Sequence, residues 1–174
     1  MPTKIAINGF GRTGRMFFRA ALHHPDLELV AVNDLTDAPT LAHLLKYDSI
    51  HGALKYEAKV EGDSIFVAGR AIQVLSEHDP AKLPWRRLGV QIAIESSGKF
   101  RTREKAALHL AAGASKVLIS APGDGADVTL CLGVNQESYD PAATTLSRTL
   151  HARPTVSRQL RKCFTKTSGL RTPS

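Results

Sequence analysis

Short apolar runs and segments with helical spacing of apolar residues follow one another along the chain. Runs of mostly apolar residues predict strands at 4–8, 28–33, 72–75, 91–95 and 116–120. Apolar residues recur at helical spacing in other segments, which predicts helices at 11–23, 38–46 and 102–112. Because the predicted strands and helices largely alternate, the pattern indicates an α/β fold with a mostly parallel sheet.

The stretch 54–74 departs from this alternation. It contains three short runs, at 54–60, 65–67 and 71–74, which are separated by turns that contain glycine. Short strands joined by tight turns pair antiparallel, so we expect a small antiparallel insertion in the sheet. One more apolar run, at 128–132, predicts a further strand.

A glycine-rich turn, Gly9–Gly14, joins the first predicted strand to the first predicted helix. Its pattern is Gly-x-Gly-x-x-Gly, in which each glycine has a mechanical task. Gly9 permits the tight turn, Gly11 lets the backbone approach a pyrophosphate, and Gly14 lets the helix pack closely on the strand. The helix N-terminus presents free N–H groups and a partial positive charge to the phosphates. The segment therefore predicts a dinucleotide-binding site.

Asp34 stands twenty residues beyond Gly14, directly after Asn33 at the end of the second apolar run. A carboxylate at this distance accepts hydrogen bonds from the hydroxyl groups of the adenosine ribose. It also repels a 2′-phosphate, which favours NAD over NADP. Glycines cluster in ordinary turns as well, so a purely structural turn is the alternative. The preceding strand, the following helix and the acid together favour NAD binding and a Rossmann-type, doubly wound sheet.

Charge is distributed unevenly along the 174 residues, whose formal net charge is +7. Residues 1–143 contain 16 basic and 16 acidic groups, whereas residues 144–174 contain seven basic groups and no acid. The latter segment has few large apolar residues and cannot offset its ordering entropy. We therefore expect a Rossmann domain at 1–143 and a disordered basic tail at 144–174. Such a tail binds RNA and other polyanions non-specifically, so a nucleotide-binding module with a basic arm is an alternative function.

The cysteines, the histidines and the lengths of the apolar runs argue against a disulfide framework, a metal site and a membrane span. Cys131 and Cys163 provide neither a disulfide framework nor the spacing of metal ligands. His43 and His51 have no third ligand near them in the sequence, so we expect no metal site. The sequence shows no signal peptide and no apolar stretch long enough to cross a membrane. We therefore expect a cytoplasmic location and no membrane association.

Longer motifs extend across most of residues 3–143. They are Ile5–Arg12, Ala31–Asp37, Leu41–Ser49, Glu95–Phe100, Leu118–Pro122 and Gly133–Gln136. Through these motifs the chain resembles glyceraldehyde-3-phosphate dehydrogenase. The resemblance implies the NAD-binding domain of an NAD-dependent, phosphorylating oxidoreductase of glycolysis that assembles as a homotetramer. An erythrose-4-phosphate dehydrogenase is the alternative, since the nucleotide half alone separates the two substrates poorly.

The resemblance also implies roles for individual residues. In the family, the backbones of Arg12 and Thr13 meet the pyrophosphate, and His78 stands where an arginine usually faces the adenine with its backbone. The Ser97–Gly98 turn and Ser120 line the nicotinamide side. The expected cofactor-binding residues are Gly9, Phe10, Gly11, Arg12, Thr13, Asn33, Asp34, His78, Ser97, Gly98 and Ser120.

The family's catalytic motif, Ser-Asn-Ala-Ser-Cys-Thr-Thr-Asn-Cys, is expected shortly after Pro141. This chain instead reads Ser-Arg-Thr-Leu-His-Ala-Arg-Pro-Thr-Val at 147–156. The codons TCG AAC GCT TCA TGC ACG ACC AAC TGT encode the family motif. Read one frame displaced, with two pyrimidines before and a C after, the same bases encode this decapeptide. We therefore interpret the chain from about residue 144 as a frameshift product that lacks the catalytic cysteine and substrate domain and is inactive alone. A genuine divergent basic tail is the alternative.

Overall fold

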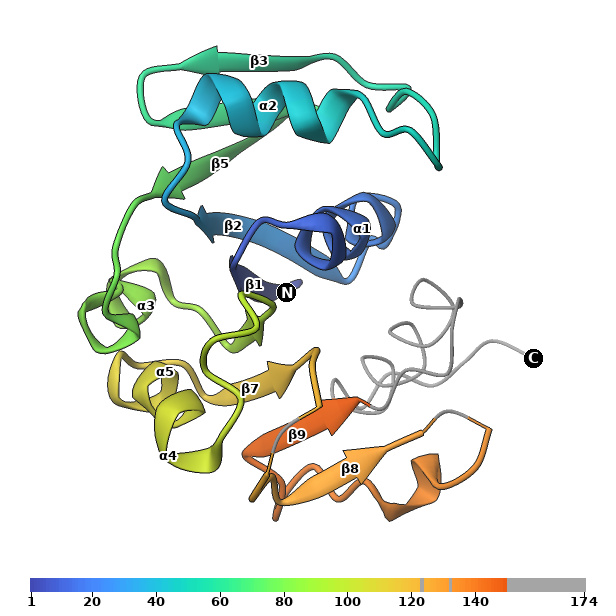
Figure 1. Ribbon diagram of the computed structural model, residues 1–174, viewed down its shortest axis with the longest axis vertical. Helices are drawn as coiled ribbons and strands as arrows, with labels where there is room; N and C mark the ends of the chain where they lie inside the picture. The colour runs from blue at the N-terminus through green and yellow to red at the C-terminus, as the bar shows by residue number, and fades with distance from the viewer. Residues whose placement is uncertain (123, 132, 150–174) are drawn as a thin grey trace.

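The structure, a computed structural model, describes residues 1–122, 124–131 and 133–149 (Figure 1). Its strands are β1 (Thr3–Asn8), β2 (Leu27–Asn33), β3 (Ala58–Glu61), β4 (Ser64–Val67), β5 (Arg70–Leu75), β6 (Ile92–Glu95), β7 (Lys116–Ile119), β8 (Val128–Leu130) and β9 (Leu146–Thr149). Its α-helices are α1 (Arg12–Ala21), α2 (Ala38–Lys46), α3 (Trp85–Leu88), α4 (Arg103–Ala106) and α5 (Leu108–Ala111). The short 3-10 helices are η1 (Pro80–Lys82) and η2 (Gln136–Ser138).

These strands form one nine-stranded sheet in the order β3-β4-β5-β2-β1-β6-β7-β9-β8. In Figure 1 the sheet runs from β3 at the top to β8 at the bottom. β4 pairs antiparallel with both β3 and β5, and every other neighbouring pair is parallel. The predicted parallel sheet with a small antiparallel insertion is therefore confirmed.

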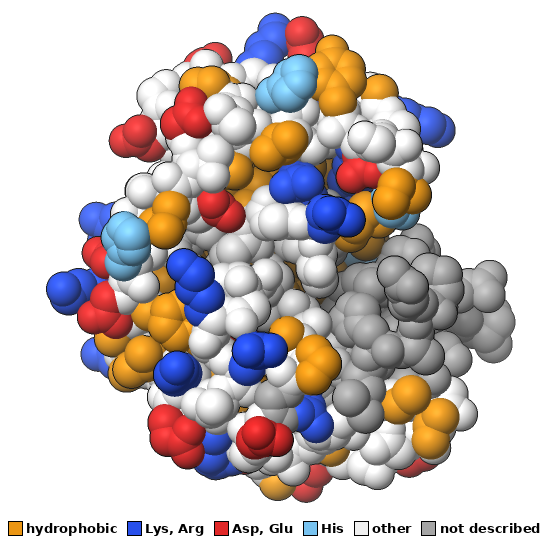
Figure 2. Space-filling view, viewed as in Figure 1, with side chains coloured by type: hydrophobic (Ala, Val, Ile, Leu, Met, Phe, Trp, Pro, Cys, Tyr) orange, Lys and Arg blue, Asp and Glu red, His pale blue; other side chains and the backbone are white. Residues whose placement is uncertain are grey.

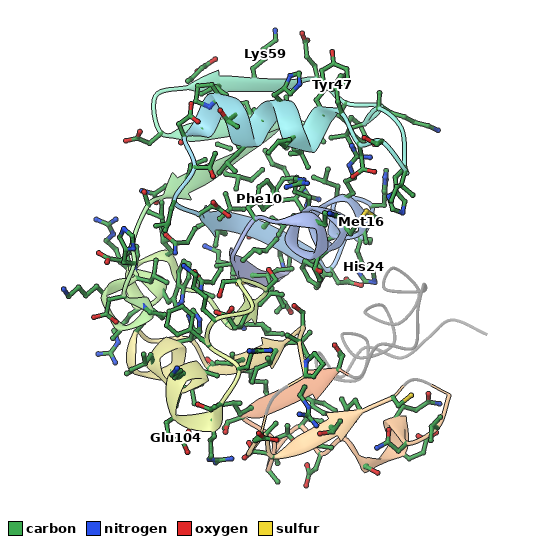
Figure 3. All side chains as sticks on the ribbon, in the orientation of Figure 1. Phe10, Met16, His24, Tyr47, Lys59 and Glu104 are labelled. Carbon is green, nitrogen blue, oxygen red and sulfur yellow. The ribbon has the colours of Figure 1, made fainter. Side chains whose placement is uncertain are left out.

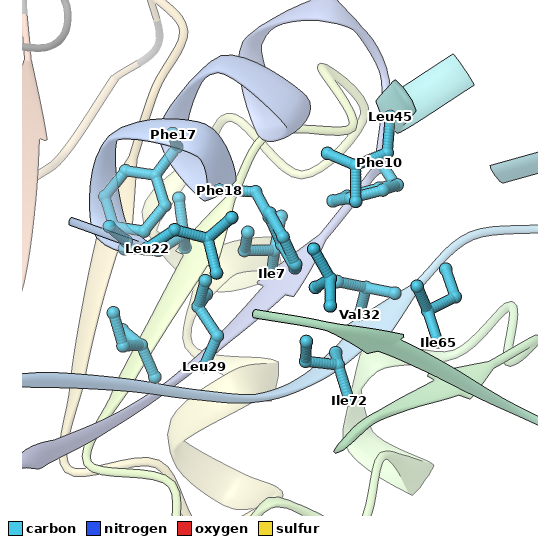
Figure 4. Close-up of a cluster of buried hydrophobic side chains, with 14 of the residues drawn as sticks. Ile7, Phe10, Phe17, Phe18, Leu22, Leu29, Val32, Leu45, Ile65 and Ile72 are labelled. Carbon is cyan, nitrogen blue, oxygen red and sulfur yellow. The ribbon is translucent and has the colours of Figure 1, made fainter. Parts of the chain in front are cut away.

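Alternate side chains of the central strand β1 face two different layers of helices. Ile5 and Ile7 pack in the larger apolar cluster, to which α1 and α2 contribute aromatic and aliphatic side chains (Figure 4). Ala6 belongs to a second cluster around Trp85 of α3. Since successive strand residues point to opposite faces, helices cover both faces of the sheet. This arrangement confirms the doubly wound prediction.

Charged side chains of both signs are interspersed over the face shown in Figure 2. This mixture agrees with the neutral charge balance of residues 1–143. Two large apolar side chains near the end of α2, Tyr47 and Ile50, are 56% and 79% exposed. Within the described ranges, no helix has the length and apolar character needed to cross a bilayer.

The helix predicted at 102–112 is divided into α4 and α5. Ala107 lies between them, and its carbonyl oxygen accepts hydrogen bonds from the amides of Leu110 and Ala111, at 3.0 and 3.1 Å. An acceptor shared between the third and fourth following residues tightens the turn and interrupts the regular helix. The sequence pattern does not show α3 either, because four residues are too few to display a helical period.

The prediction of a disordered tail from residue 144 is wrong for residues 144–149. Residues Leu146–Thr149 form β9, which lies between β7 and β8 in the sheet. Leu146 is 1% exposed and shares a core cluster with Val117 and Ile119. One buried leucine makes no periodic pattern, so the sequence does not reveal this strand. Residues 150–174 of the predicted tail, including Cys163, lie outside the described residues.

The side chain of Asp127 accepts hydrogen bonds from the backbone at the start of β9. Its Oδ2 accepts hydrogen bonds from the amides of Thr145 and Leu146, at 3.0 and 2.8 Å, and its Oδ1 pairs with the Arg103 guanidinium. Burial raises the pKa of Asp127, but the hydrogen bonds from Arg103, Leu146 and Thr145 together outweigh it and lower this pKa to about 2. The carboxylate is therefore ionised at neutral pH and holds two backbone amides of the incoming strand.

Candidate cofactor site

A cleft of about 260 Å³ lies where β1, β2, β5 and β6 end. Asn8 and Asn33 are the last residues of β1 and β2, and Glu77 and Ser96 follow the ends of β5 and β6. Between β1 and β6 the order of strands reverses, because the chain proceeds from β1 outward in both directions along the sheet. In open α/β sheets, ligands bind beyond the carboxyl ends of the strands at such a switch point.

One wall of the cleft, called the first wall below, consists of the glycine turn Gly9–Gly14 and Asp34. Two of its glycines, Gly9 and Gly14, allow the turn to contact neighbouring backbone directly. Gly9 has a φ of +89°, and a Cβ added there would lie 2.3 Å from the backbone nitrogen of Ser97. A Cβ on Gly14 would lie 2.3 Å from the carbonyl oxygen of Gly9. No other residue fits either position, since each contact is made by backbone atoms that cannot rotate away. The turn therefore packs against both α1 and the segment that follows β6.

Gly11 differs from these two glycines because its side-chain position is open. A Cβ added at Gly11 would have no heavy atom within 4 Å, yet the residue lines the cleft. Its φ of −69° is accessible to any residue, so neither packing nor backbone conformation of the protein requires glycine here. The open space agrees with the close approach of a pyrophosphate to the backbone, and the first turn of α1 begins at the next residue. The residues present thus fit a dinucleotide.

Asp34 links the end of β2 to the glycine turn. Its Oδ2 accepts a hydrogen bond from the amide of Phe10 at 2.7 Å, and its Oδ1 accepts one from the amide of Thr36 at 3.1 Å. A carboxylate has about four acceptor positions, so each oxygen retains a position for a further donor. Asp34 is half-buried and lines the cleft, where a ribose hydroxyl can reach the remaining positions.

The opposite wall, called the second wall below, is formed by the residues that follow β6. They are held by Glu95, the last residue of β6, which is 1% exposed. Its Oε1 accepts hydrogen bonds from the Ser97 amide at 2.8 Å and the Ser97 hydroxyl at 2.6 Å. Its Oε2 accepts one from the Asn8 side-chain amide at 2.6 Å and lies 3.0 Å from Nε2 of His109. These four contacts correspond to the four acceptor positions of a carboxylate, so the buried Glu95 side chain is fully hydrogen-bonded.

Asn8 and Asn33 connect the two walls across the strand ends. Asn33 accepts a hydrogen bond from the Glu77 amide at 2.8 Å, and its Nδ2 donates to Oδ1 of Asn8 at 2.7 Å. Because a backbone N–H can only donate, the Glu77 amide fixes the orientation of the Asn33 side chain. The orientation of Asn8 follows, so the donors point in sequence from the end of β5 toward Glu95.

Comparison with known proteins identifies the family. Residues 3–103 match the family model described as glyceraldehyde 3-phosphate dehydrogenase, NAD binding domain. This match covers more than half of the chain. The chain belongs to the glyceraldehyde-3-phosphate dehydrogenase family.

Several relatives named glyceraldehyde-3-phosphate dehydrogenase are more than 50% identical to the chain. The protein of Geobacillus stearothermophilus is 59% identical over 143 residues, which are 82% of this chain and 43% of the relative. Glyceraldehyde-3-phosphate dehydrogenase 1 of Bacillus subtilis is 56% identical over 142 residues, with 82% and 42% covered. The Thermotoga maritima protein is 53% identical over 148 residues, with 83% and 44% covered. The chain thus spans less than half the length of these relatives.

The matched part is the NAD-binding domain of glyceraldehyde-3-phosphate dehydrogenase, so NAD is the cofactor, as the sequence predicts. The fold and the cofactor are thereby confirmed together. The individual cofactor-binding residues remain predictions, which the geometry of the cleft now sharpens.

The cleft brings together part of the predicted cofactor set, namely Gly9, Gly11, Asn33, Asp34, His78 and Ser97. Phe10 belongs to the turn, but its side chain is 1% exposed. Its ring points into the core toward Phe18, with ring centroids 5.4 Å apart (Figures 3 and 4). Arg12 and Thr13 form the first turn of α1, next to Gly11.

Two other predicted residues stand beside the cleft lining. Gly98 is exposed and lies between the lining residues Ser97 and Lys99. Ser120 follows β7, and its amide donates a hydrogen bond to the Glu95 carbonyl at 2.9 Å. Ser120 is therefore close to the end of β6 in the sheet but is not part of the cleft lining.

The structure adds lining residues that sequence reasoning missed: Asn8, Leu35, Glu77, Ser96, Lys99 and Phe100. Several of them end or closely follow predicted strands, so the rule that ligands bind at carboxyl ends of parallel strands could have found them. The buried pair of His109 and Trp85 behind Glu95 has no such signal. Trp85 belongs to α3 and His109 to α5, so their contact joins two elements that no sequence pattern relates.

Proposed function

We propose that this chain serves as the NAD-binding domain of a phosphorylating glyceraldehyde-3-phosphate dehydrogenase of glycolysis. The observation that carries the proposal is the open backbone at Gly11, which lines the cleft together with Asp34. The family match and the names of the relatives support glyceraldehyde 3-phosphate as substrate over erythrose 4-phosphate.

In this proposal the first wall binds the adenosine half and the phosphates. The backbone amides of Arg12 and Thr13 donate to the pyrophosphate at the N-terminus of α1. Asp34 accepts hydrogen bonds from the ribose hydroxyls through its remaining acceptor positions. Phe10 anchors the turn in the core, and Asn33 holds the end of β2 through its contacts with neighbouring strands.

The second wall binds the nicotinamide half in the same proposal. The Ser97–Gly98 turn and Ser120 lie on this side. His78 also lines the cleft, and in this proposal its backbone faces the adenine. When bound, NAD supplies the acceptor for the hydride that leaves the substrate. The contribution of this chain is to orient the dinucleotide and to fix the spacing of the two walls.

We further propose that residues 144–174 arise from a frameshift and that the chain alone does not turn over the aldehyde. The support is the identity between residues 147–156 and a displaced reading of the family's cysteine motif. β9 lies in the sheet, and this placement is compatible with either origin of the segment. Codons that cannot produce the cysteine motif in another frame would contradict the frameshift.

Assembly, location and charge-driven binding complete the proposal. The family resemblance supports a homotetramer for the whole enzyme, and cysteine usage without a disulfide framework supports a cytoplasmic location. Of the seven cations of residues 144–174, Arg148 lies in β9 and donates a hydrogen bond to Thr129. Non-specific polyanion binding through the other six remains a prediction, because they lie outside the described residues.

Titration calorimetry with NAD tests the proposed function on the full chain. We expect Gly11→Ala to weaken NAD binding at least about tenfold, or about 1.4 kcal/mol, because the added methyl group occupies the space that the ligand approaches. The free energy of unfolding should change by less than about 0.5 kcal/mol, since the added Cβ has no neighbour within 4 Å.

Ser115→Ala is the control for this comparison. Ser115 is exposed and precedes β7, at the edge of the sheet opposite the cleft, so both quantities should stay unchanged. Absence of NAD binding by the unmodified chain, or equal NAD affinity in Gly11→Ala, would contradict the proposal.

A further inference from the structure

A buried imidazole and the single tryptophan of the chain lie behind the Glu95 wall. Trp85 and His109 are both 0% exposed, and Nε1 of Trp85 lies 3.0 Å from Nδ1 of His109. An indole N–H can only donate, so Nδ1 of His109 is the acceptor. His109 is therefore neutral and carries its proton on Nε2, which donates to Oε2 of Glu95 at 3.0 Å.

We propose that Glu95 is a positioning residue for the NAD cleft, which holds the Ser97 hydroxyl and amide in place while His109 fixes Glu95 from behind. The inference rests on the NAD-binding function proposed above. Ser97 lines the cleft, whereas Glu95 is buried beneath it. Any effect of Glu95 on the cofactor must therefore pass through the residues that it holds.

In all the side-chain hydrogen bonds around Glu95, its neighbours donate and its carboxyl oxygens accept. Donors converge on it from Trp85 through His109 on one side and from Asn33 through Asn8 on the other. A neutral amide of the same shape would place an N–H group opposite another donor. If the His109 proton moved to Nδ1, it would face the N–H group of Trp85. If the Asn8 side-chain amide turned over, its N–H group would face that of Asn33. The network thus requires a carboxyl group rather than an amide at this position.

Ser97 also sets the separation of the two walls. Its backbone nitrogen would lie 2.3 Å from a Cβ on Gly9, so the two backbones are in direct contact. The neighbouring Ser96 hydroxyl donates to the Gly9 carbonyl at 2.6 Å. A displacement of Ser97 therefore moves the glycine turn as well, and a single buried glutamate controls the geometry on both sides of the cleft.

A double-mutant cycle on NAD affinity tests this inference with the full chain. We expect Glu95→Gln to weaken NAD binding about tenfold, in line with the loss of hydrogen bonds to a charged group. In the Ser97→Ala background the same substitution should weaken binding by at most about threefold, because its effect passes partly through the Ser97 hydroxyl. A purely structural role would give the same loss in both backgrounds.

Substitutions of His109 provide a second test if Glu95→Gln fails to fold. Gln retains an N–H group that can reach Glu95, whereas Leu does not. We expect NAD affinity to fall about fivefold in His109→Leu and to stay within about twofold in His109→Gln. Fluorescence of Trp85, the single tryptophan, reports whether each variant keeps its buried environment.

The possible results separate the inference from the proposed function. No NAD binding by the unmodified chain would overturn both. Binding by the unmodified chain, with equal losses in the two Ser97 backgrounds or with no loss in Glu95→Gln, would overturn only the role of Glu95. Where Glu95→Gln does not fold, equal affinities of His109→Gln and His109→Leu would do the same.

Discussion

The two halves of the sheet are stabilised by different kinds of contact. Around β1–β5, the helices α1 and α2 cover the sheet with large side chains such as Phe18 and Leu45, which are 1% and 0% exposed. Around β6–β9, α3, α4 and α5 have four residues each, and apart from Trp85 many of the buried apolar side chains are small, such as Ala93 and Ala106. The first half is thus stabilised mainly by burial of apolar surface area, and the second half has less apolar surface to bury.

Hydrogen-bonded polar groups, some of them buried, compensate for this difference in the second half. Trp85, His109 and Glu95 form one hydrogen-bonded series, and Asp127 holds the start of β9. Removal of one partner from such a pair leaves the other partner buried without a hydrogen bond. Asn8 and Asn33 extend this series to the ends of β1 and β2. Most of the first half nevertheless depends on its apolar surface, whereas the second half depends more on individual residues.

The largest expected effect is in the first half. Phe18→Ala should lower the free energy of unfolding by about 4 kcal/mol, because it removes a buried ring from the cluster and leaves a cavity. Urea unfolding followed by circular dichroism measures the change. Leu44→Ala on α2, where Leu44 is 37% exposed, is the control and should cost less than about 1 kcal/mol. Similar losses in the two variants would contradict the apolar origin of stability in this half.

A smaller loss is expected from a substitution in the second half that preserves most of the apolar area. Trp85→Phe keeps an aromatic ring but removes the donor to Nδ1 of His109, so we expect a loss of about 2 kcal/mol in unfolding free energy. Tyr47→Phe, at a residue that is 56% exposed, serves as a control for removal of an exposed polar group. An unchanged stability in Trp85→Phe would show that the polar series adds nothing to this half.

The smallest expected effect is local and depends on pH. The pKa of Asp127 is lowered from 3.8 to about 2, so its contribution is complete above about pH 4 and is lost as the pH falls toward 2. Amide hydrogen exchange should show that Leu146 loses protection over this interval while Ile7 in β1 does not. Asp127→Asn should remove this pH dependence. Equal changes at Leu146 and Ile7 would instead indicate global unfolding.

The same contrast explains how much of the fold could be predicted. The strands of the first half appear in the sequence as apolar runs, and α1 and α2 appear at helical spacing. In the second half, Ala107 interrupts a helix through a shared acceptor, and β9 depends on Leu146 and the distant Asp127. Contacts between residues far apart in the sequence leave no periodic pattern, so sequence reasoning could not locate these features.

The candidate site divides in the same way. Gly9, Gly11 and Asp34 were predictable because a tight turn, the approach of a pyrophosphate and the binding of a ribose require these residue types at fixed spacing. The wall around Glu95 was not predictable as a unit, since its order depends on His109, whose partners come from different elements. A motif reveals what the backbone must do, whereas a buried polar series is visible only after folding.

The position of β9 has a consequence for the order of assembly during synthesis. Among the described residues, β8 pairs with β9 alone, and β9 occupies the place between β8 and β7. A ribosome therefore releases β8 before its neighbour exists, and β7 keeps an open edge until residues 146–149 emerge. A single short segment then closes two interfaces at once, so any nascent chain that stops before Leu146 exposes an unpaired edge to other proteins.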